Sequence, residues 1–261
     1  MKRSSQCLLL LILPICVLTP LQAYQESYFS LPVRGDTAVP VWVITPEAPV
    51  ASVVLFSGGS GVLKITPKGI GRTGNFLIRS RFRFAEQGLQ VVIVDKPDDR
   101  GDLHDARTRA EHADDVGAVI AFTRHRLARP VWLVGTSRGV ISAANAAARL
   151  DGDSGPDGLV LTASVMRTGN AGQDSLVNVD LGAITAPILL VHHQDDGCYV
   201  SPAADMPILA GEFTRASVVE LKLVSGGSAP AFNPCKANTF HGFWGIEAQV
   251  VKTLADWIKS H

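Results

Sequence analysis

The hydrophobic residues of this chain form short continuous runs, and longer segments of mixed polarity separate them. The continuous runs predict strands at residues 40–44, 52–56, 89–94, 130–134, 159–165, 187–191 and 218–224. The segments between them predict helices at residues 76–87, 106–127, 140–150 and 246–258. Strands that are apolar on both faces and alternate with helices indicate a parallel sheet covered by helices on both faces. The pattern therefore predicts one α/β domain.

The N-terminal residues follow a different pattern. Two basic residues precede an apolar stretch over residues 7–18, and Ala23 is a small residue at a plausible cleavage position. This arrangement is typical of a secretory signal peptide, so we expect residues 1–23 to be removed and residues 24–261 to be exported to the periplasm or secreted. An uncleaved anchor and a lipoprotein signal at Cys16 are the alternatives. The apolar stretch is short for a membrane span, so we expect no stable span after cleavage.

Composition and charge narrow the class of protein further. The 261 residues are 46% hydrophobic, and 24 basic residues balance 24 acidic ones. A nucleic-acid-binding surface needs an excess of basic residues, so we do not expect a nucleic-acid partner. The exported chain would keep Cys198 and Cys235, which are expected to form a disulfide in an oxidising compartment. Two separate buried thiols are the alternative.

A glycine-rich pentapeptide lies between a predicted strand and a predicted helix. It reads Gly-Thr-Ser-Arg-Gly over residues 135–139, which is the spacing Gly-x-Ser-x-Gly. Such a turn holds the serine at its apex in a strained conformation, and side chains at the two glycine positions would collide with neighbouring backbone. An ordinary connection with a capping serine is the alternative. The strand before and the helix after the turn favour Ser137 as a nucleophile.

A nucleophilic serine needs a base, and the base needs a carboxylate that orients it. After a Gly-x-Ser-x-Gly elbow, the acid comes next along the chain and the histidine last. Asp195 and Asp196 follow the predicted strand at 187–191, and His241 lies between the last predicted strand and the final helix. We therefore expect Ser137, one of the two carboxylates and His241 to form a catalytic triad.

The other histidines are weaker candidates for the base. His104, His112 and His125 precede the serine, in or beside a predicted surface helix, and are expected to be solvated. His192 and His193 are expected to shape the loop that carries Asp195 and Asp196, which we call the acid loop, rather than bind a metal. No further cluster of ligand residues has suitable spacing. We therefore expect neither a metal nor another cofactor.

Two backbone N–H groups usually stabilise the negative charge that develops on the oxygen of an attacked carbonyl group. One candidate is the N–H of Arg138, directly after the nucleophile. The other belongs to the glycine-rich segment at residues 57–61, where Gly59 is favoured by position and Ser60 is the alternative. These groups would form an oxyanion hole.

A bridge between Cys198 and Cys235 would link the acid loop to the loop that carries His241, which we call the base loop. Cys198 lies two residues after Asp196, and Cys235 lies six residues before His241. Besides stabilising the fold, the bridge would hold the acid and the base in register. A bridge with a stabilising role alone is the alternative.

These segments resemble the three signatures of the α/β-hydrolase superfamily, in the same order and across nearly the whole exported chain. In relatives the acid segment often reads His-Gly-x-x-Asp, and a Val-Pro pair follows a few residues later. Here residues 192–196 read His-His-Gln-Asp-Asp, and residues 200–202 read Val-Ser-Pro. This alignment selects Asp196 as the acid. The sequence departs from the pattern at His193, where glycine is usual, and at Ser57, where many members carry histidine.

The resemblance implies an eight-stranded, mostly parallel sheet with helices on both faces. The chain is similar to small, nearly capless members of the superfamily, of the esterase or dienelactone-hydrolase kind. We therefore expect hydrolysis of a carboxylic ester or related acyl bond in a small-molecule substrate, through an acyl-enzyme. A serine peptidase or thioesterase is the nearest alternative, and a non-catalytic binding protein on the same fold is the other.

Overall fold

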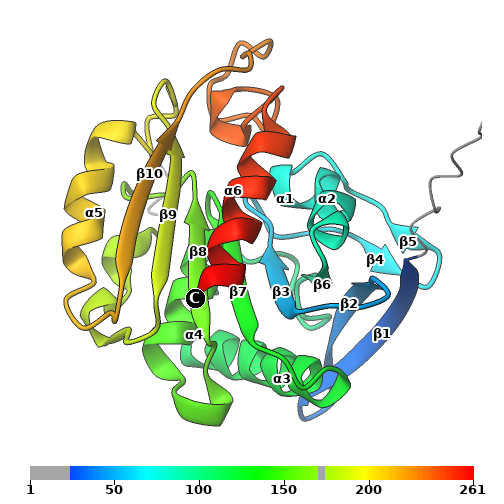
Figure 1. The fold of residues 1–261 in the computed structure, drawn as a ribbon. Helices are drawn as coiled ribbons and strands as arrows, with labels where there is room; N and C mark the ends of the chain where they lie inside the picture. The colour runs from blue at the N-terminus through cyan, green and yellow to red at the C-terminus, as the bar shows by residue number, and fades with distance from the viewer. Residues whose placement is uncertain (1–23, 170–173) are drawn as a thin grey trace, which may run out of the picture.

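An eight-stranded sheet forms the centre of the molecule (Figure 1). The computed structural model describes residues 24–169 and 174–261, so the predicted signal peptide at residues 1–23 lies outside the described residues. The strands follow the order β1-β2-β6-β3-β7-β8-β9-β10 across the sheet. Their bounds are β1 Gln25–Arg34, β2 Thr37–Thr45, β3 Ala51–Phe56, β6 Leu89–Val94, β7 Val131–Thr136, β8 Gly158–Thr162, β9 Ile188–His193 and β10 Val219–Val224. A separate hairpin pairs β4 Ile65–Thr66 with β5 Gly69–Ile70.

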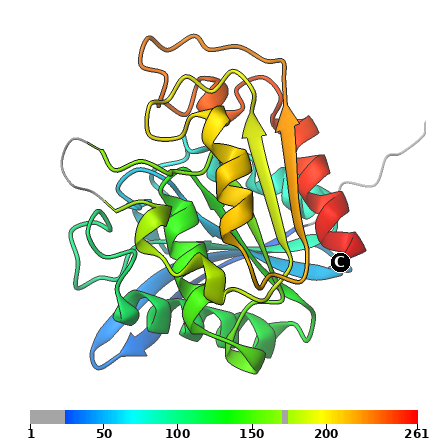
Figure 2. The same cartoon turned by 90° about the vertical axis from the view of Figure 1, so that its left-hand side faces the viewer.

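The directions of the strands bring several loops to one edge of the sheet. Strand β2 pairs antiparallel with both β1 and β6, whereas the neighbouring strands from β6 to β10 are parallel. Figure 2 shows the arrowheads of β9 (yellow) and β10 (orange) at the end where the long loops gather. The chain adds β6 on one side of β3 and β7 on the other. In open α/β sheets, ligands bind at the carboxyl edge beside such a switch point.

Helices cover both faces of the sheet, as predicted. Their bounds are α1 Phe76–Arg79, α2 Arg81–Glu86, α3 Ala110–Arg126, α4 Gly139–Arg149, α5 Met206–Glu212 and α6 Glu247–Ser260. Buried residues of α3, α4 and α5 join one apolar cluster, and those of α1, α2 and α6 join the cluster on the opposite face. Strands β3, β6, β7, β8 and β9 are buried along their whole length, which explains why they read as continuous apolar runs.

Two helices differ from the prediction. The helix predicted at 76–87 is interrupted at Ser80, whose φ of −94° and ψ of 3° separate α1 from α2. The helix predicted at 106–127 begins only at Ala110, because Arg109 is extended. The preceding residues 101–109 form turns and carry a buried arginine whose contacts are described below.

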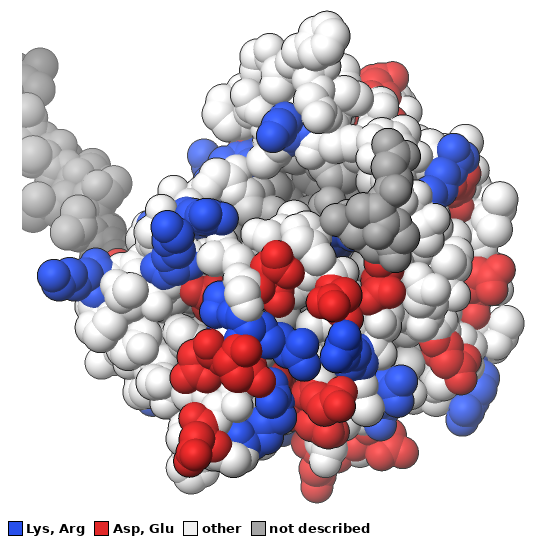
Figure 3. All heavy atoms as spheres, turned by 180° about the vertical axis from the view of Figure 1, so that it is seen from behind, with Lys and Arg blue, Asp and Glu red and all other residues white. Residues whose placement is uncertain are grey.

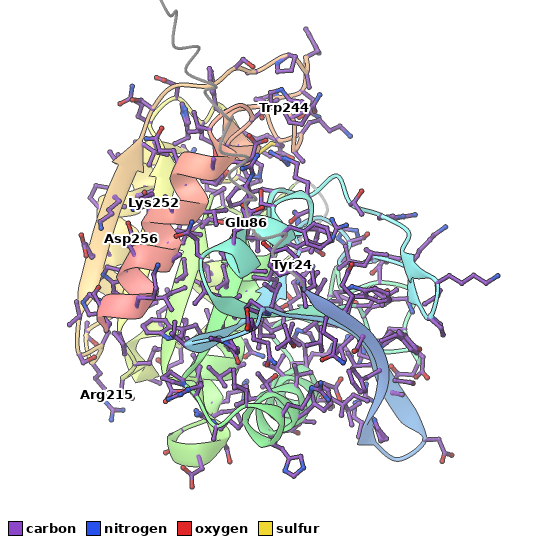
Figure 4. All side chains as sticks on the ribbon, turned by 45° about the vertical axis from the view of Figure 1, so that its right-hand side comes forward. Tyr24, Glu86, Arg215, Trp244, Lys252 and Asp256 are labelled. Atoms are coloured by element: carbon purple, nitrogen blue, oxygen red, sulfur yellow. A yellow bond between two sulfur atoms is a disulfide. The ribbon has the colours of Figure 1, made fainter. Side chains whose placement is uncertain are left out.

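Acidic and basic side chains are interspersed on the face seen from behind (Figure 3). Many of them pair; for example, Arg34 forms ion pairs at 2.9 Å with both Asp99 and Asp115. On α6, Lys252 and Asp256 lie one turn apart and pair at 2.6 Å (Figure 4). Among the helices of the described residues, none is long and apolar enough to cross a membrane.

Candidate active site

Ser137 lies on a sharp turn between β7 and α4. Its φ of 52° falls in the left-handed region that L-residues rarely adopt. The flanking glycines leave no room for a side chain. A Cβ at Gly135 would lie 2.6 Å from the backbone of α4, and one at Gly139 would lie 2.1 Å from the carbonyl oxygen of Phe56. The turn therefore has the strained geometry that the sequence spacing predicts.

His241 reaches the serine from the loop after β10. It lies in a 3₁₀ turn over residues 240–242, and the Thr239 hydroxyl caps this turn by accepting the His241 N–H at 3.2 Å. The imidazole Nε2 is 2.9 Å from Ser137 Oγ. The fold therefore brings together two groups that lie 104 residues apart in the sequence.

Asp196 lies on the other side of the imidazole. Its Oδ2 is 2.8 Å from His241 Nδ1, and its Oδ1 accepts the N–H of Cys198 at 2.9 Å. Because a carboxylate can only accept, Nδ1 carries the proton and Nε2 keeps its lone pair toward the Ser137 hydroxyl. The arrangement can thus withdraw the serine proton.

Two buried residues outside the expected triad support the carboxylate. The Ser201 hydroxyl lies 3.3 Å from Asp196 Oδ2, and His192 Nε2 lies 3.2 Å from the same oxygen. His192 Nε2 also donates to the Ser201 carbonyl at 2.9 Å. Burial by itself raises the pKa of Asp196, but hydrogen bonds from His192 and His241 outweigh it and hold this pKa well below its usual range. Asp196 is therefore charged beside the imidazole. Ser201 lies inside the Val-Ser-Pro segment, which was its one signal in the sequence.

Asp195 points away from the histidine base. Its side chain is 57% exposed. Its N–H donates to His193 Nδ1 at 3.1 Å, and His193 Nε2 donates to the carbonyl of Gly226 at 2.8 Å. The His193 ring also stacks on Phe240 with a centroid distance of 4.5 Å. His193 thus braces the acid loop against the base loop, at the position where relatives usually carry glycine.

A disulfide between Cys198 and Cys235 joins the acid loop to the base loop. Cys198 is buried, and Cys235 is partly exposed and lines the pocket beside Ser137. The bridge closes a stretch with a sequence separation of 37 residues, which includes β10.

Replacing both cysteines with serine is expected to lower the free energy of unfolding by about 4 kcal/mol. Without the cross-link, the unfolded chain gains conformational entropy, and folding must then remove it. Urea denaturation of the oxidised wild type and of the double variant measures the difference. Reduced wild type is the matched control and should unfold like the variant. A difference below about 1 kcal/mol would show that the bridge does not constrain the unfolded chain as this model assumes.

The groups expected to form the oxyanion hole lie beside the serine. Gly59 lines an open pocket of about 300 Å³ together with Ser137 and His241. The N–H groups of Gly59 and Arg138 donate to no acceptor in the described residues. A Cβ at Gly58 would lie 2.8 Å from the Cβ of Ser137, so the glycine segment packs directly against the nucleophile. The remaining lining includes Asn75, Phe76, Lys236 and Ala237.

Arg79 holds the base loop from the opposite side, and no sequence motif indicated it. Its Nη2 donates to the carbonyl of Gly242, directly after the histidine, and its Nε pairs with Glu247 at 2.9 Å. The guanidinium carbon lies 5.1 Å from the centroid of Trp244, which sits near the start of α6 (Figure 4). These contacts hold the segment that directly follows His241 in the chain.

His112 is buried, and the expectation that it is solvated was wrong. It lies on the inner face of α3, where its Nε2 contacts the Ser142 hydroxyl at 2.8 Å. Burial lowers the pKa of His112 to about 3, and the nearby cations of Arg107, Arg100 and Arg34 act in the same direction. The carboxylates of Asp95 and Asp115 border the small cavity beside the ring. His112 is therefore neutral in the folded protein at neutral pH.

The stability of the protein is expected to fall as the pH decreases below about 6.5 toward 3. In this range His112 binds a proton in the unfolded chain but stays neutral in the folded protein. His112→Gln should lose less stability over this range. Thermal unfolding at pH 7.5, 5.5 and 4.5 measures the slope, and His125→Gln, which changes an exposed residue of the same helix, is the matched control. Equal slopes for wild type and His112→Gln would contradict the assignment.

The arrangement around Ser137 has the groups that nucleophilic acyl transfer requires. The hydroxyl, the imidazole and the carboxylate form one chain of hydrogen bonds, and free N–H donors lie beside the hydroxyl. In the described residues, no three or more His, Cys, Asp or Glu side chains group as metal ligands do.

No protein-family model and no curated protein matches the sequence. Solved structures do share its fold. A cold-adapted esterase from an Arctic intertidal metagenomic library is 19% identical, with 91% of this chain and 95% of that chain covered and a TM-score of 0.62. An α/β serine hydrolase without lid from Xanthomonas campestris is 16% identical, with 90% and 98% covered and a TM-score of 0.57. A dienelactone hydrolase from Anabaena variabilis is 15% identical, with 91% and 98% covered and a TM-score of 0.58.

These neighbours and the strand order define the class of structure: the chain has the α/β-hydrolase fold. The eight-stranded, mostly parallel sheet with helices on both faces confirms the fold that the resemblance implied.

Proposed function

We propose that this protein is a serine hydrolase that cleaves a carboxylic ester or a related acyl bond. One observation carries the proposal: Ser137 Oγ lies 2.9 Å from His241 Nε2, and His241 Nδ1 lies 2.8 Å from Asp196, beside an open pocket. The α/β-hydrolase fold and the esterases among its structural neighbours support the same class.

In the proposed reaction, Ser137 Oγ attacks the carbonyl carbon of the substrate while His241 Nε2 takes the serine proton. The N–H groups of Gly59 and Arg138 stabilise the oxyanion. His241 then gives its proton to the leaving alcohol, which departs and leaves an acyl-serine. Water, deprotonated by His241, attacks this ester, and His241 then returns the proton to Ser137 Oγ as the acid leaves. Asp196 keeps the imidazole oriented and stabilises its protonated form.

We further propose that the substrate is a small acyl compound and that the protein acts in the periplasm or outside the cell. The Cys198–Cys235 disulfide supports an oxidising compartment. The pocket of about 300 Å³ is open to solvent at the loop edge and has the size of a small-molecule site.

Labelling with a fluorophosphonate probe tests the mechanism. We expect wild type to be labelled and Ser137→Ala to remain unlabelled, because the probe phosphonylates an activated serine hydroxyl. Ser164→Ala, which changes another buried serine, is the matched control and should be labelled like wild type. Equal labelling of wild type and Ser137→Ala would contradict Ser137 as the nucleophile. An unlabelled wild type that turns over none of a broad panel of acyl substrates would favour a binding protein.

A further inference from the structure

Arg107 lies buried behind the glycine segment that borders Ser137. We call residues 57–61 the oxyanion loop. This name assumes the role that the proposed function gives to the segment, so the role inferred for Arg107 rests on that function. Arg107 is 1% exposed. Its Nη2 donates to the carbonyl of Ser57 at 3.1 Å and to that of Gly59 at 3.4 Å, while its Nη1 donates to the Ser142 hydroxyl at 2.7 Å.

This guanidinium has no carboxylate partner. In the described residues no acid forms an ion pair with Arg107, and its Nε makes no hydrogen bond. Burial lowers the pKa of Arg107 to about 9, the Arg138 cation acts in the same direction and the Asp102 carboxylate, which is not in ion-pair contact, acts against both, so the group is still charged at neutral pH. Burying a charge without an ion-pair partner lowers stability.

The contacts of Arg107 fix the peptide planes of the oxyanion loop. In a trans peptide the N–H points opposite to the carbonyl of the preceding residue. Arg107 holds the carbonyls of Ser57 and Gly59, and the Gly61 N–H holds that of Gly58 at 3.3 Å. Three successive carbonyls of the loop therefore each accept a hydrogen bond, and the N–H groups of residues 58–60 donate to no acceptor in the described part of the chain.

Unpaired N–H groups from successive peptides form an anion-binding concavity. The oxyanion loop packs against the nucleophile, since a Cβ at Gly58 would lie 3.3 Å from Ser137 Oγ. The loop also packs closely against the arginine. A Cβ at Gly61 would lie 2.7 Å from Leu103 Cδ1 and 2.8 Å from Arg107 Nη2, so a side chain there would require both neighbours to move.

We propose that Arg107 is a positioning residue for the oxyanion hole: its guanidinium holds the carbonyls of Ser57 and Gly59, and thereby aims the loop's N–H donors at the charge that develops beside Ser137. The cation also adds a positive potential behind these donors. Arg107 acts through the loop and does not itself contact the substrate. Arg107 contacts the carbonyl of the Gly59–Ser60 peptide, which carries the Ser60 N–H, whereas the Gly61 N–H contacts the carbonyl of the Gly58–Gly59 peptide, which carries the Gly59 N–H. Gly59 and Ser60 therefore both remain candidate donors to the oxyanion.

Arg107→Lys and Arg107→Met test the proposal. Lysine keeps the charge but cannot hold two carbonyls and a hydroxyl with a planar fork, and methionine removes both charge and donors. We expect kcat for a p-nitrophenyl ester to fall about 10-fold in the lysine variant and about 100-fold in the methionine variant, while KM changes less than about twofold, because the lost interaction belongs to the transition state. Phenylboronic acid, which forms a tetrahedral adduct on the serine, should bind more weakly by a similar factor.

Arg124→Lys is the matched control. Arg124 also donates to a backbone carbonyl, that of Gly155 at 2.7 Å. It lies in the last turn of α3, whereas Arg107 precedes the first residue of this helix. The control should keep wild-type kcat and phenylboronate affinity. Thermal unfolding identifies variants that fail to fold. Ser142→Ala, which removes the Nη1 anchor of Arg107 together with the contact of the same hydroxyl with His112, then provides a smaller defect in kcat and phenylboronate affinity.

The outcomes separate the two proposals. Folded Arg107 variants with wild-type kcat and wild-type phenylboronate affinity would overturn the role of Arg107. A fall in kcat without weaker phenylboronate binding would also overturn it, because the defect would then lie outside the oxyanion hole. A wild type that neither hydrolyses the ester nor binds phenylboronate would contradict the proposed function itself.

Discussion

Replacing His241 with alanine is expected to lower kcat/KM by about 10⁵- to 10⁶-fold, and adding Ser137→Ala should cause little further loss. The two side chains lie 2.9 Å apart and form one proton-transfer unit. Without the imidazole, the serine hydroxyl keeps its proton and is a weak nucleophile. Without the hydroxyl, the imidazole has no proton to take. Either single change therefore removes the function of both groups.

Steady-state kinetics on one ester, with the two single variants and the double variant, measure this coupling. His125→Ala, on the exposed side of α3, is the control and should keep wild-type activity. If the losses in the two single variants multiply in the double variant, Ser137 and His241 act independently, and the triad as drawn is wrong.

The sequence predicted the fold well wherever burial is complete. The run at Leu89–Val94 coincides with β6, because a strand covered on both faces must be apolar at every position. Strand β1 was missed because it lies at the sheet edge with half-buried polar and apolar residues and contains Pro32. Helix α5 was missed because Pro207 and Gly211 weaken its helical pattern, so packing against the sheet decides its conformation.

For the site, the sequence could predict groups that depend on chain order and backbone geometry. Ser137 stands in a spacing that only a sharp turn explains, and His241 follows the last strand. The buried supports could not be predicted in this way. Arg107 lies in a polar segment typical of a surface helix, and the Val-Ser-Pro segment that contains Ser201 does not indicate that its hydroxyl reaches Asp196. Their roles arise from contacts between segments that are far apart in the sequence, which no local pattern encodes.

The hydrogen bonds around Asp196 predict that even an isosteric replacement will fail. Oδ1 accepts the N–H of Cys198, and Oδ2 accepts from His241, from His192 and from the Ser201 hydroxyl. Asparagine must place an NH₂ group at one of these two positions, where it faces donors. If the NH₂ group faces His241, the ring must accept at Nδ1 and carry its proton on Nε2, so it can no longer take the proton of the serine.

We therefore expect Asp196→Asn to lower kcat by about 10³- to 10⁴-fold, with a wild-type far-ultraviolet spectrum. Part of this loss comes from the tautomer, and part comes from losing the negative charge that stabilises the imidazolium. Asp195→Asn is the matched control: it makes the same chemical change at the adjacent, exposed carboxylate and should change kcat less than about twofold. A large loss in Asp195→Asn together with an active Asp196→Asn would reverse the assignment of the acid. Equal, small effects in both variants would mean that the imidazole is oriented without a carboxylate, with Ser201, 3.1 Å from Nδ1, as the remaining contact.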